Sequence, residues 1–190
     1  QYRMGQDRMH HDVFFVRPED VNADRLVFRG GENRHLVCVL RKRAGDSVTA
    51  VDGRGKAYDV HILKTGRQET TAEITGMRTR PGEWNVELTL AQGLIKSGRF
   101  DWLVEKATEM GVSRIIPVRT EHSVLKTLAP QRLSRLRKIA LSAVKQSGRS
   151  VLPDLTQAVS LDALLESSTH YDARFIAHAG TAARTAPDAP

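Results

Sequence analysis

The feature that most restricts the fold is a change of hydrophobic pattern at Arg80-Pro81-Gly82. Before this point the apolar residues form short runs typical of strands, and after it such runs alternate with longer segments of helical period. Proline followed by glycine interrupts both kinds of element. The sequence therefore predicts two domains, over residues 13–80 and 83–190, preceded by a flexible leader or expression remnant over residues 1–12.

The first domain is expected to be a small β-barrel. The predicted strands cover residues 13–16, 47–51, 57–63 and 70–77. Asp52-Gly53-Arg54-Gly55 is a hairpin signal between two of them. Residues 32–43 place Leu36, Val39 and Leu40 at helical spacing, so one short helix is expected to plug the sheet. Cys38 lies in this apolar stretch and is expected to be buried, without a disulfide partner.

The second domain is expected to contain a parallel sheet with covering helices, because strands and helices alternate along it. The predicted strands begin at Val86, Arg114 and Ala173. The predicted helices carry inward-facing residues at Phe100, Leu103, Val104, Ala107 and Met110, then at Leu133, Leu136, Ile139, Ala140 and Val144, with a short third one over residues 161–165. Ligands of such sheets bind at the carboxyl ends of the strands.

The loop that follows the first of these strands holds two cations, Lys96 and Arg99, beside Gly93 and Gly98. Backbone N–H groups and the helix dipole at the next helix favour an anion there, so both side chains are candidates to bind phosphate. The alternative is a solvated turn with two exposed charges. The pattern is not a nucleotide-binding Walker loop.

Residues 131–149 form a strongly basic predicted helix with no acidic residue. Its cations are Arg132, Arg135, Arg137, Lys138, Lys145 and Arg149. They either follow a nucleic-acid backbone or form a solvated face. The net charge of +7 favours a polyanionic partner over an acidic one.

Several classes of protein are not supported by the sequence. The chain has no apolar run near the roughly 18 residues that span a bilayer, so we expect a cytoplasmic protein with no membrane association. It also lacks the usual hydrolase and zinc motifs, so no metal is expected, and no residue stands out as a general base.

Residues 92–112 carry the most specific signal, and they read QGLIKSGRFDWLVEKATEMGV. This stretch resembles the first motif of the bacterial methyltransferases that modify N3 of a uridine in small-subunit (16S) ribosomal RNA, members of the SPOUT superfamily. Further matching segments are Ile116-Pro117, Glu121-His122-Ser123-Val124, Gln146-Ser147-Gly148-Arg149 with Pro153, His35-Leu36 with Val39-Leu40-Arg41, and Asp52-Gly53.

The resemblance implies a fold class and a function. The fold is an N-terminal PUA-like RNA-binding barrel joined to an α/β-knot (SPOUT) methyltransferase domain. The function is methylation of ribosomal RNA, free or in the small subunit, by a homodimer that uses S-adenosylmethionine. The residues implied to face RNA are Lys96, Arg99, Arg41, Arg132, Lys138 and Arg149, and those implied to line the donor site are His178, Ala179 and Gly180.

The chain departs from the family pattern in three places. Lys145 and His122 stand where the family often has Glu and Arg. The family's Gly-Pro-Glu-Gly-Gly loop and the knot segment after it have no counterpart before Pro190, so we expect a C-terminally incomplete domain that does not bind the donor tightly. A non-catalytic RNA-binding or ribosome-assembly protein, or a dimerisation module, therefore remains the alternative.

Overall fold

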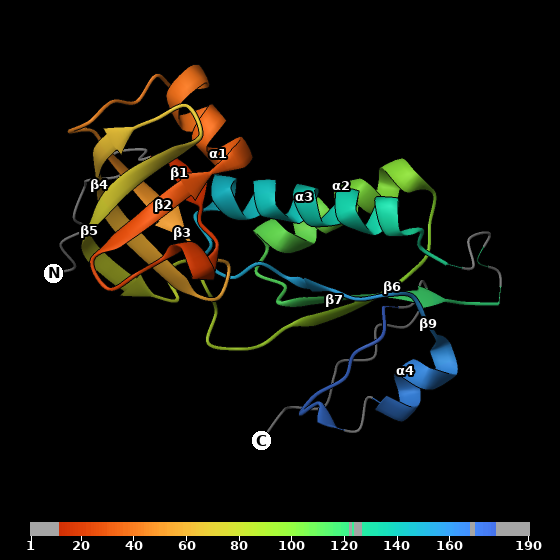
Figure 1. Cartoon of the computed structure of the whole chain (residues 1–190). Coiled ribbons are helices and arrows are strands. Elements are labelled where there is room, and N and C mark those ends of the chain that lie inside the picture. The colour runs from red at the N-terminus through yellow and green to blue at the C-terminus, as the bar shows by residue number, and fades with distance from the viewer. Residues whose placement is uncertain (1–11, 122, 124–126, 168–169, 178–190) are drawn as a thin grey trace, which may run out of the picture.

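The computed structural model describes residues 12–121, 123, 127–167 and 170–177. A curled N-terminal sheet lies at one end and a layered α/β part at the other, and helix α3 (Pro130–Ser147) runs between them (Figure 1). The expected leader over residues 1–12 lies outside the described residues except for Asp12. The Asp12 carboxylate pairs with Lys42 at 3.0 Å, so the described chain is anchored from its first residue.

The N-terminal sheet has five strands in the order β1-β3-β4-β5-β2. They are β1 (Val13–Phe15), β2 (Arg25–Arg29), β3 (Ser47–Val51), β4 (Lys56–Thr65) and β5 (Glu69–Thr79). Only the β1–β3 pairing is parallel. Phe14, Phe28 and Leu36 are fully buried inside the curled sheet with the alternate residues of the other strands. A short 3-10 helix, η1 (Pro18–Asp20), precedes β2, a strand that the sequence did not predict.

The β3–β4 hairpin forms where it was expected. Gly53 and Gly55 both have positive φ angles, of 71° and 101°, which only glycine adopts without strain. The Asp52 side chain accepts hydrogen bonds from the backbone N–H groups of Arg54 at 2.8 Å and Lys56 at 3.0 Å. This turn therefore fixes the register of the β3–β4 hairpin, in which Val51 pairs with Ala57.

The helix that plugs the sheet differs from the prediction in its winding. It begins as α1 (Gly30–Arg34) and continues as the π-helix η2 (His35–Val39), in which Leu40 N–H donates to the carbonyl of His35. A π-helix has a wider turn than an α-helix, so residues at α-helical spacing leave the buried face. Leu36 is buried as expected, but Val39 is 63% exposed and Cys38 is exposed, which corrects both predictions.

The second sheet is parallel, as predicted. Its strands are β6 (Thr89–Gly93), β7 (Arg114–Arg119), β8 (Asp154–Leu155) and β9 (Val159–Ser160), and β7 pairs with the other three. Helices α2 (Ser97–Glu109) and α3 cover one face, and α4 (Leu161–Ser167) lies on the other side (Figure 1). Phe100, Val104, Ile115 and Leu136 form the buried core between helices and sheet.

Three predictions in this domain are corrected. Strand β6 starts at Thr89, so Val86 and Leu88 are exposed residues before it. Met110 caps the end of α2 and is exposed, because the helical period ends one residue earlier. Residues 173–177 form no strand: this segment pairs with no strand in the described chain, and Ile176 is 91% exposed. Residues that favour strands form one only where a sheet edge accepts their hydrogen bonds.

The two parts of the molecule are joined by an ion pair between α3 and α1. Lys145 Nζ lies 2.8 Å from Glu32 Oε1, and the other oxygen of Glu32 accepts the Phe15 N–H at 3.1 Å. Both side chains of the ion pair are mostly buried. We expect Lys145→Met, which keeps the apolar stem, to lower the free energy of unfolding by about 1 kcal/mol in urea denaturation. Lys138→Met, an exposed lysine on the same helix, is the control and should change it by less than about 0.5 kcal/mol.

Candidate functional site

The carboxyl ends of β6 and β7 lie at the end of the sheet that is farther from the barrel (Figure 1). After β6, the Leu94 N–H donates to the carbonyl of Val118 at 2.9 Å, which holds the following loop against β7. After β7, the Ser123 hydroxyl accepts the Thr120 N–H at 3.0 Å and lies 2.9 Å from the Thr120 hydroxyl. The chain therefore leaves β6 and β7 at neighbouring points of the sheet.

Lys96 and Arg99 flank the start of α2, and both are exposed. Lys96 is the N-cap residue, and no side chain in the described chain caps the free N–H groups of the first turn. The first turn also lacks an acidic residue, and neither cation forms an ion pair within the described residues. Free N–H groups and two cations together make this loop attractive to phosphate.

Arg132 lies beside this loop, half-buried rather than on a solvated face. Its Nη2 donates to the carbonyl of Ile95 at 3.4 Å, and its guanidinium carbon lies 6.0 Å from the centre of the Phe100 ring. Its Nε is buried without a hydrogen-bond partner among the described residues. The side chain therefore ties α3 to the loop that carries Lys96.

The outer face of α3 is the exposed part of the basic helix. Lys138 and Arg135 line a surface depression of about 540 Å³ with Pro130, Gln131 and Ser134. Arg135 pairs with Asp101 of α2 at 2.7 Å, so part of its charge is already neutralised. Lys138 forms no ion pair in the described chain, which leaves it available to an anionic partner.

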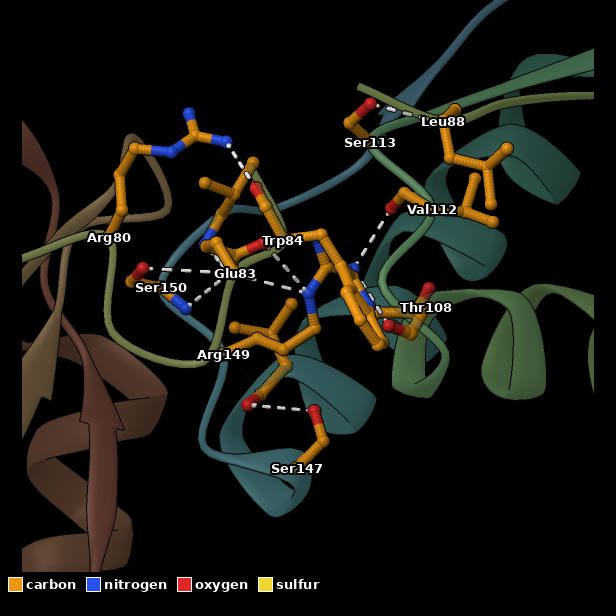
Figure 2. A network of polar contacts seen from close by, with 12 residues as sticks. Arg80, Glu83, Trp84, Leu88, Thr108, Val112, Ser113, Ser147, Arg149 and Ser150 are labelled. Carbon is orange, nitrogen blue, oxygen red and sulfur yellow. Dashed lines mark hydrogen bonds and ion pairs between the residues drawn. The ribbon is translucent and has the colours of Figure 1, made fainter. Parts of the chain in front are cut away.

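Arg149 is internal, although it was predicted to face RNA. Its side chain is 2% exposed and pairs with Glu83 at 2.6 Å, where the partner is 3% exposed. Its Nη1 also donates to the carbonyls of Thr108 and Val112 at 2.7 and 2.9 Å, at the end of α2 (Figure 2). All of its donors are directed into the protein, so Arg149 holds the domain together and is not offered to RNA.

Glu83, the partner of Arg149, was not predicted from the sequence to be important. Its Oε1 accepts the backbone N–H groups of Ser150 and Val151 at 2.8 and 2.9 Å, while its Oε2 faces Arg149 (Figure 2). The link after β5, the end of α2 and the chain after α3 therefore meet at one buried ion pair. The only sequence signal was an acidic residue directly after Pro81-Gly82.

Arg41, another of the predicted residues, lies apart from this region. Arg41 is on the barrel, exposed, with an unusual φ of 54°. His178, Ala179 and Gly180 lie outside the described residues. Among the described residues, no helix combines the length and hydropathy that crossing a membrane requires. The same part of the chain contains no group of three or more His, Cys, Asp or Glu placed to hold a metal ion.

A family model described as an RNA methyltransferase domain matches residues 82–188, more than half of the 190 residues. The chain belongs to the RNA methyltransferase family. A second model, described as an RNA methyltransferase PUA domain, matches residues 28–75 within the curled sheet of this family member. The predicted fold class, a PUA-like barrel joined to an α/β methyltransferase domain of the SPOUT type, is confirmed.

Individual relatives agree with this assignment. Ribosomal RNA small subunit methyltransferase E of Bacillus subtilis is 26% identical over 159 residues, which cover 82% of the chain and 62% of the relative. A crystal structure of the methyltransferase E of Neisseria gonorrhoeae, bound to S-adenosyl methionine, superposes with a TM-score of 0.73 at 31% identity. A probable rRNA methyltransferase of Porphyromonas gingivalis gives 0.70 at 29%. The two superpositions cover 82% and 81% of this chain, and 65% and 63% of the Neisseria and Porphyromonas chains.

The chain therefore spans about 62% of the length of the Bacillus relative. The predicted resemblance to the small-subunit ribosomal RNA methyltransferases is confirmed at the level of the family.

Proposed function

We propose that the native protein transfers a methyl group from S-adenosylmethionine to N3 of a uridine in small-subunit ribosomal RNA. The observation that carries this proposal is the family match over residues 82–188, combined with free cations at the carboxyl ends of its parallel strands. Relatives named as small-subunit ribosomal RNA methyltransferases support the substrate class. The net charge of +7 is consistent with a polyanionic partner.

The end of β6 leaves open space beside the backbone. Gly93 ends β6, and a Cβ atom built there would approach only the Thr120 methyl group, at 3.8 Å. Small residues at a strand end leave room for a planar ligand. S-adenosylmethionine supplies an electrophilic methyl group, and we propose that His178, Ala179 and Gly180 form one wall of its site.

The chemistry at N3 requires that a negative charge be stabilised. The pKa of the uridine N3–H group lies well above neutral. The ring nitrogen therefore becomes nucleophilic only as that proton leaves. We propose that Lys96 and Arg99 hold the RNA phosphate beside the base and stabilise the developing charge. Arg132 keeps their loop in position through Ile95.

We propose that one domain binds RNA and the other transfers the methyl group. Residues 13–80 form the RNA-binding barrel, with Arg41 facing RNA, and residues 83–190 form the methyltransferase domain, with Lys138 exposed on α3. We propose that the protein acts as a homodimer on RNA or on the small ribosomal subunit, in the cytoplasm. Arg149 is left out of the RNA-facing set because it is buried against Glu83.

The test of this site is the double variant Lys96→Ala and Arg99→Ala in the native protein. We expect RNA affinity to fall about tenfold and methylation to fall with it. The slope of log affinity against log salt should become shallower by about one to two, because two phosphate contacts are lost. Fluorescence anisotropy at several salt concentrations measures both quantities, and thermal unfolding checks that the fold is intact.

The matched control is Lys64→Ala with Arg67→Ala, which removes the same charge from the β4–β5 hairpin. Both are exposed residues at the β4–β5 end of the barrel, and neither belongs to the proposed RNA-facing set of Lys96, Arg99, Arg41 and Lys138. This control should leave the salt slope within about half a unit of the unmodified protein. An equal loss of affinity in both double variants would show that only net charge matters, and it would remove Lys96 and Arg99 from the site.

A further inference from the structure

A second hollow lies on the barrel, away from the strand ends described above. It has a volume of about 530 Å³ and is enclosed by the η1–β2 loop, the β3–β4 turn and the neighbouring strands β4 and β5. Its lining residues are Pro18, Val21, Asn22, Ala23, Asp52, Arg54, Lys56, Tyr58, Ile74 and Met77. We call it the barrel groove. Its volume lies within the range of roughly 300–1,000 Å³ typical of small-molecule sites.

The barrel groove is preformed rather than a gap between loose segments. The Ile74 N–H of β5 donates to the carbonyl of Asp24 at 2.8 Å, which fixes the loop that carries Asn22 and Ala23. The opposite wall is the hairpin turn held by Asp52. Met77 and Tyr58 are direct neighbours across the β4–β5 ladder, so the wall and the floor share one rigid sheet.

The floor of the groove holds a carboxylate oxygen with a single, long hydrogen bond. Asp52 and Tyr58 are 6% and 5% exposed. Asp52 Oδ1 accepts two backbone N–H groups, but Oδ2 receives only the Tyr58 hydroxyl, at a long 3.4 Å. A buried carboxylate oxygen with free lone pairs is unfavourable unless a donor reaches it.

The Tyr58 hydroxyl donates its proton to Asp52, so both the Asp52 carboxylate and the Tyr58 oxygen can only accept hydrogen bonds from a ligand. Burial, and then the negative charge of Asp52, raise the pKa of the Tyr58 hydroxyl. The hydroxyl therefore keeps its proton at neutral pH and directs it to Asp52, and its oxygen lone pairs stay open. A ligand that fits must bring hydrogen-bond donors, not carbonyl oxygens.

The rim of the groove carries the opposite charge from the floor. Arg54 and Lys56 are exposed, and neither forms an ion pair within the described part of the chain. Ile74 and Met77 add apolar surface beside them. Apolar walls, acceptors at depth and cations at the mouth match one nucleotide: a flat base with amino donors inside and its phosphate outside.

We propose that the barrel groove binds an amino-bearing base, of cytidine, adenosine or guanosine, from single-stranded RNA. This inference rests on the proposed RNA-directed function and names a base preference within it. Uracil fits poorly, because carbonyl oxygens flank its single N–H and would face the Asp52 carboxylate. The groove therefore reads a nucleotide other than the uridine that receives the methyl group.

The test compares binding of oligocytidine and oligouridine RNA of equal length by fluorescence anisotropy. The unmodified native protein should bind oligocytidine about tenfold more tightly, the usual gain from a hydrogen bond to a charged acceptor. Ala23→Trp, which fills the groove from an exposed loop, should reduce this ratio to about one. Tyr58→Phe, which removes only the hydroxyl, should reduce it by a smaller factor.

The matched control is Ala44→Trp, which adds the same bulk at an exposed turn outside the lining of the groove. It should retain the full preference. Equal binding of the two RNAs by the unmodified protein, or a preference that survives Ala23→Trp, would overturn the groove proposal and leave the methyltransferase proposal standing. Absence of binding to either RNA would also overturn the groove proposal. The methyltransferase proposal is tested separately, by the methylation assay.

Discussion

Replacing Arg149 with alanine is expected to lower the free energy of unfolding by about 3–5 kcal/mol. The substitution leaves the Glu83 carboxylate buried without its cation, and it removes the donors to the carbonyls of Thr108 and Val112. A buried charge that loses its partner is costly because water cannot replace that partner. Urea denaturation of the native protein, followed by circular dichroism, measures the change.

The control is Arg114→Ala, which breaks an arginine–carboxylate ion pair at the surface. Arg114 and Asp154 lie 3.1 Å apart with side chains 47% and 54% exposed, so the expected loss is below about 1 kcal/mol. The double variant Glu83→Ala with Arg149→Ala should lose clearly less than the sum of the two single variants, since it leaves no unpaired charge. Strict additivity would contradict the assignment of a coupled buried pair.

Gly82→Ala is expected to cost about 2–4 kcal/mol, the second-largest effect. Gly82 has a φ of +74°, and a Cβ atom built on it would lie 2.6 Å from the carbonyl oxygen of Gly148. The cost therefore combines a left-handed backbone with a steric clash against main-chain atoms that cannot move independently. Urea denaturation again provides the measurement.

Gly148 supplies a matched control because it separates these two causes. Its φ is +71°, close to that of Gly82, but no atom lies within 4 Å of a Cβ built there. Gly148→Ala should cost only about 1 kcal/mol, the backbone part alone. Equal losses at the two glycines would show that the close approach of the inter-domain link to the end of α3 contributes nothing.

Local patterns in the sequence predicted most of the elements. The period of Phe100, Val104 and Ala107 placed α2, and Gly148 marked the end of α3, where it adopts the left-handed conformation. The Asp52-Gly53 signal placed the hairpin. These features depend on neighbours within a turn or two of the chain, which is why spacing alone revealed them.

Features that depend on distant partners were not predictable in the same way. Arg149 looked like one more cation of a basic helix, yet its partner Glu83 is 66 residues away. Strand β2 forms through its hydrogen bonds to β5, which lies far along the chain, so the local sequence did not reveal it. Cys38 and Val39 are exposed because the helix winds as a π-helix, which no spacing rule for α-helices anticipates.

The candidate site likewise combines residues that local sequence predicted with a surface that depends on distant segments. Lys96 and Arg99 were predicted from two glycines beside a helix start, and both are exposed there. The barrel groove was not predicted, because Ala23, Asp52 and Ile74 come together only through the curl of the sheet. Binding surfaces built from several segments require the fold before they are visible.

The most direct test of the central claim is methyl transfer by the native protein. The protein is incubated with methyl-labelled S-adenosylmethionine and small-subunit ribosomal RNA that lacks the modification, and the RNA is then digested to nucleosides. We expect label on N3 of uridine, greatly reduced by Lys96→Ala with Arg99→Ala and retained by Lys64→Ala with Arg67→Ala. Salt-dependent RNA binding with no label in the RNA or in the assembled small subunit would contradict it, and would identify a non-catalytic RNA-binding protein instead.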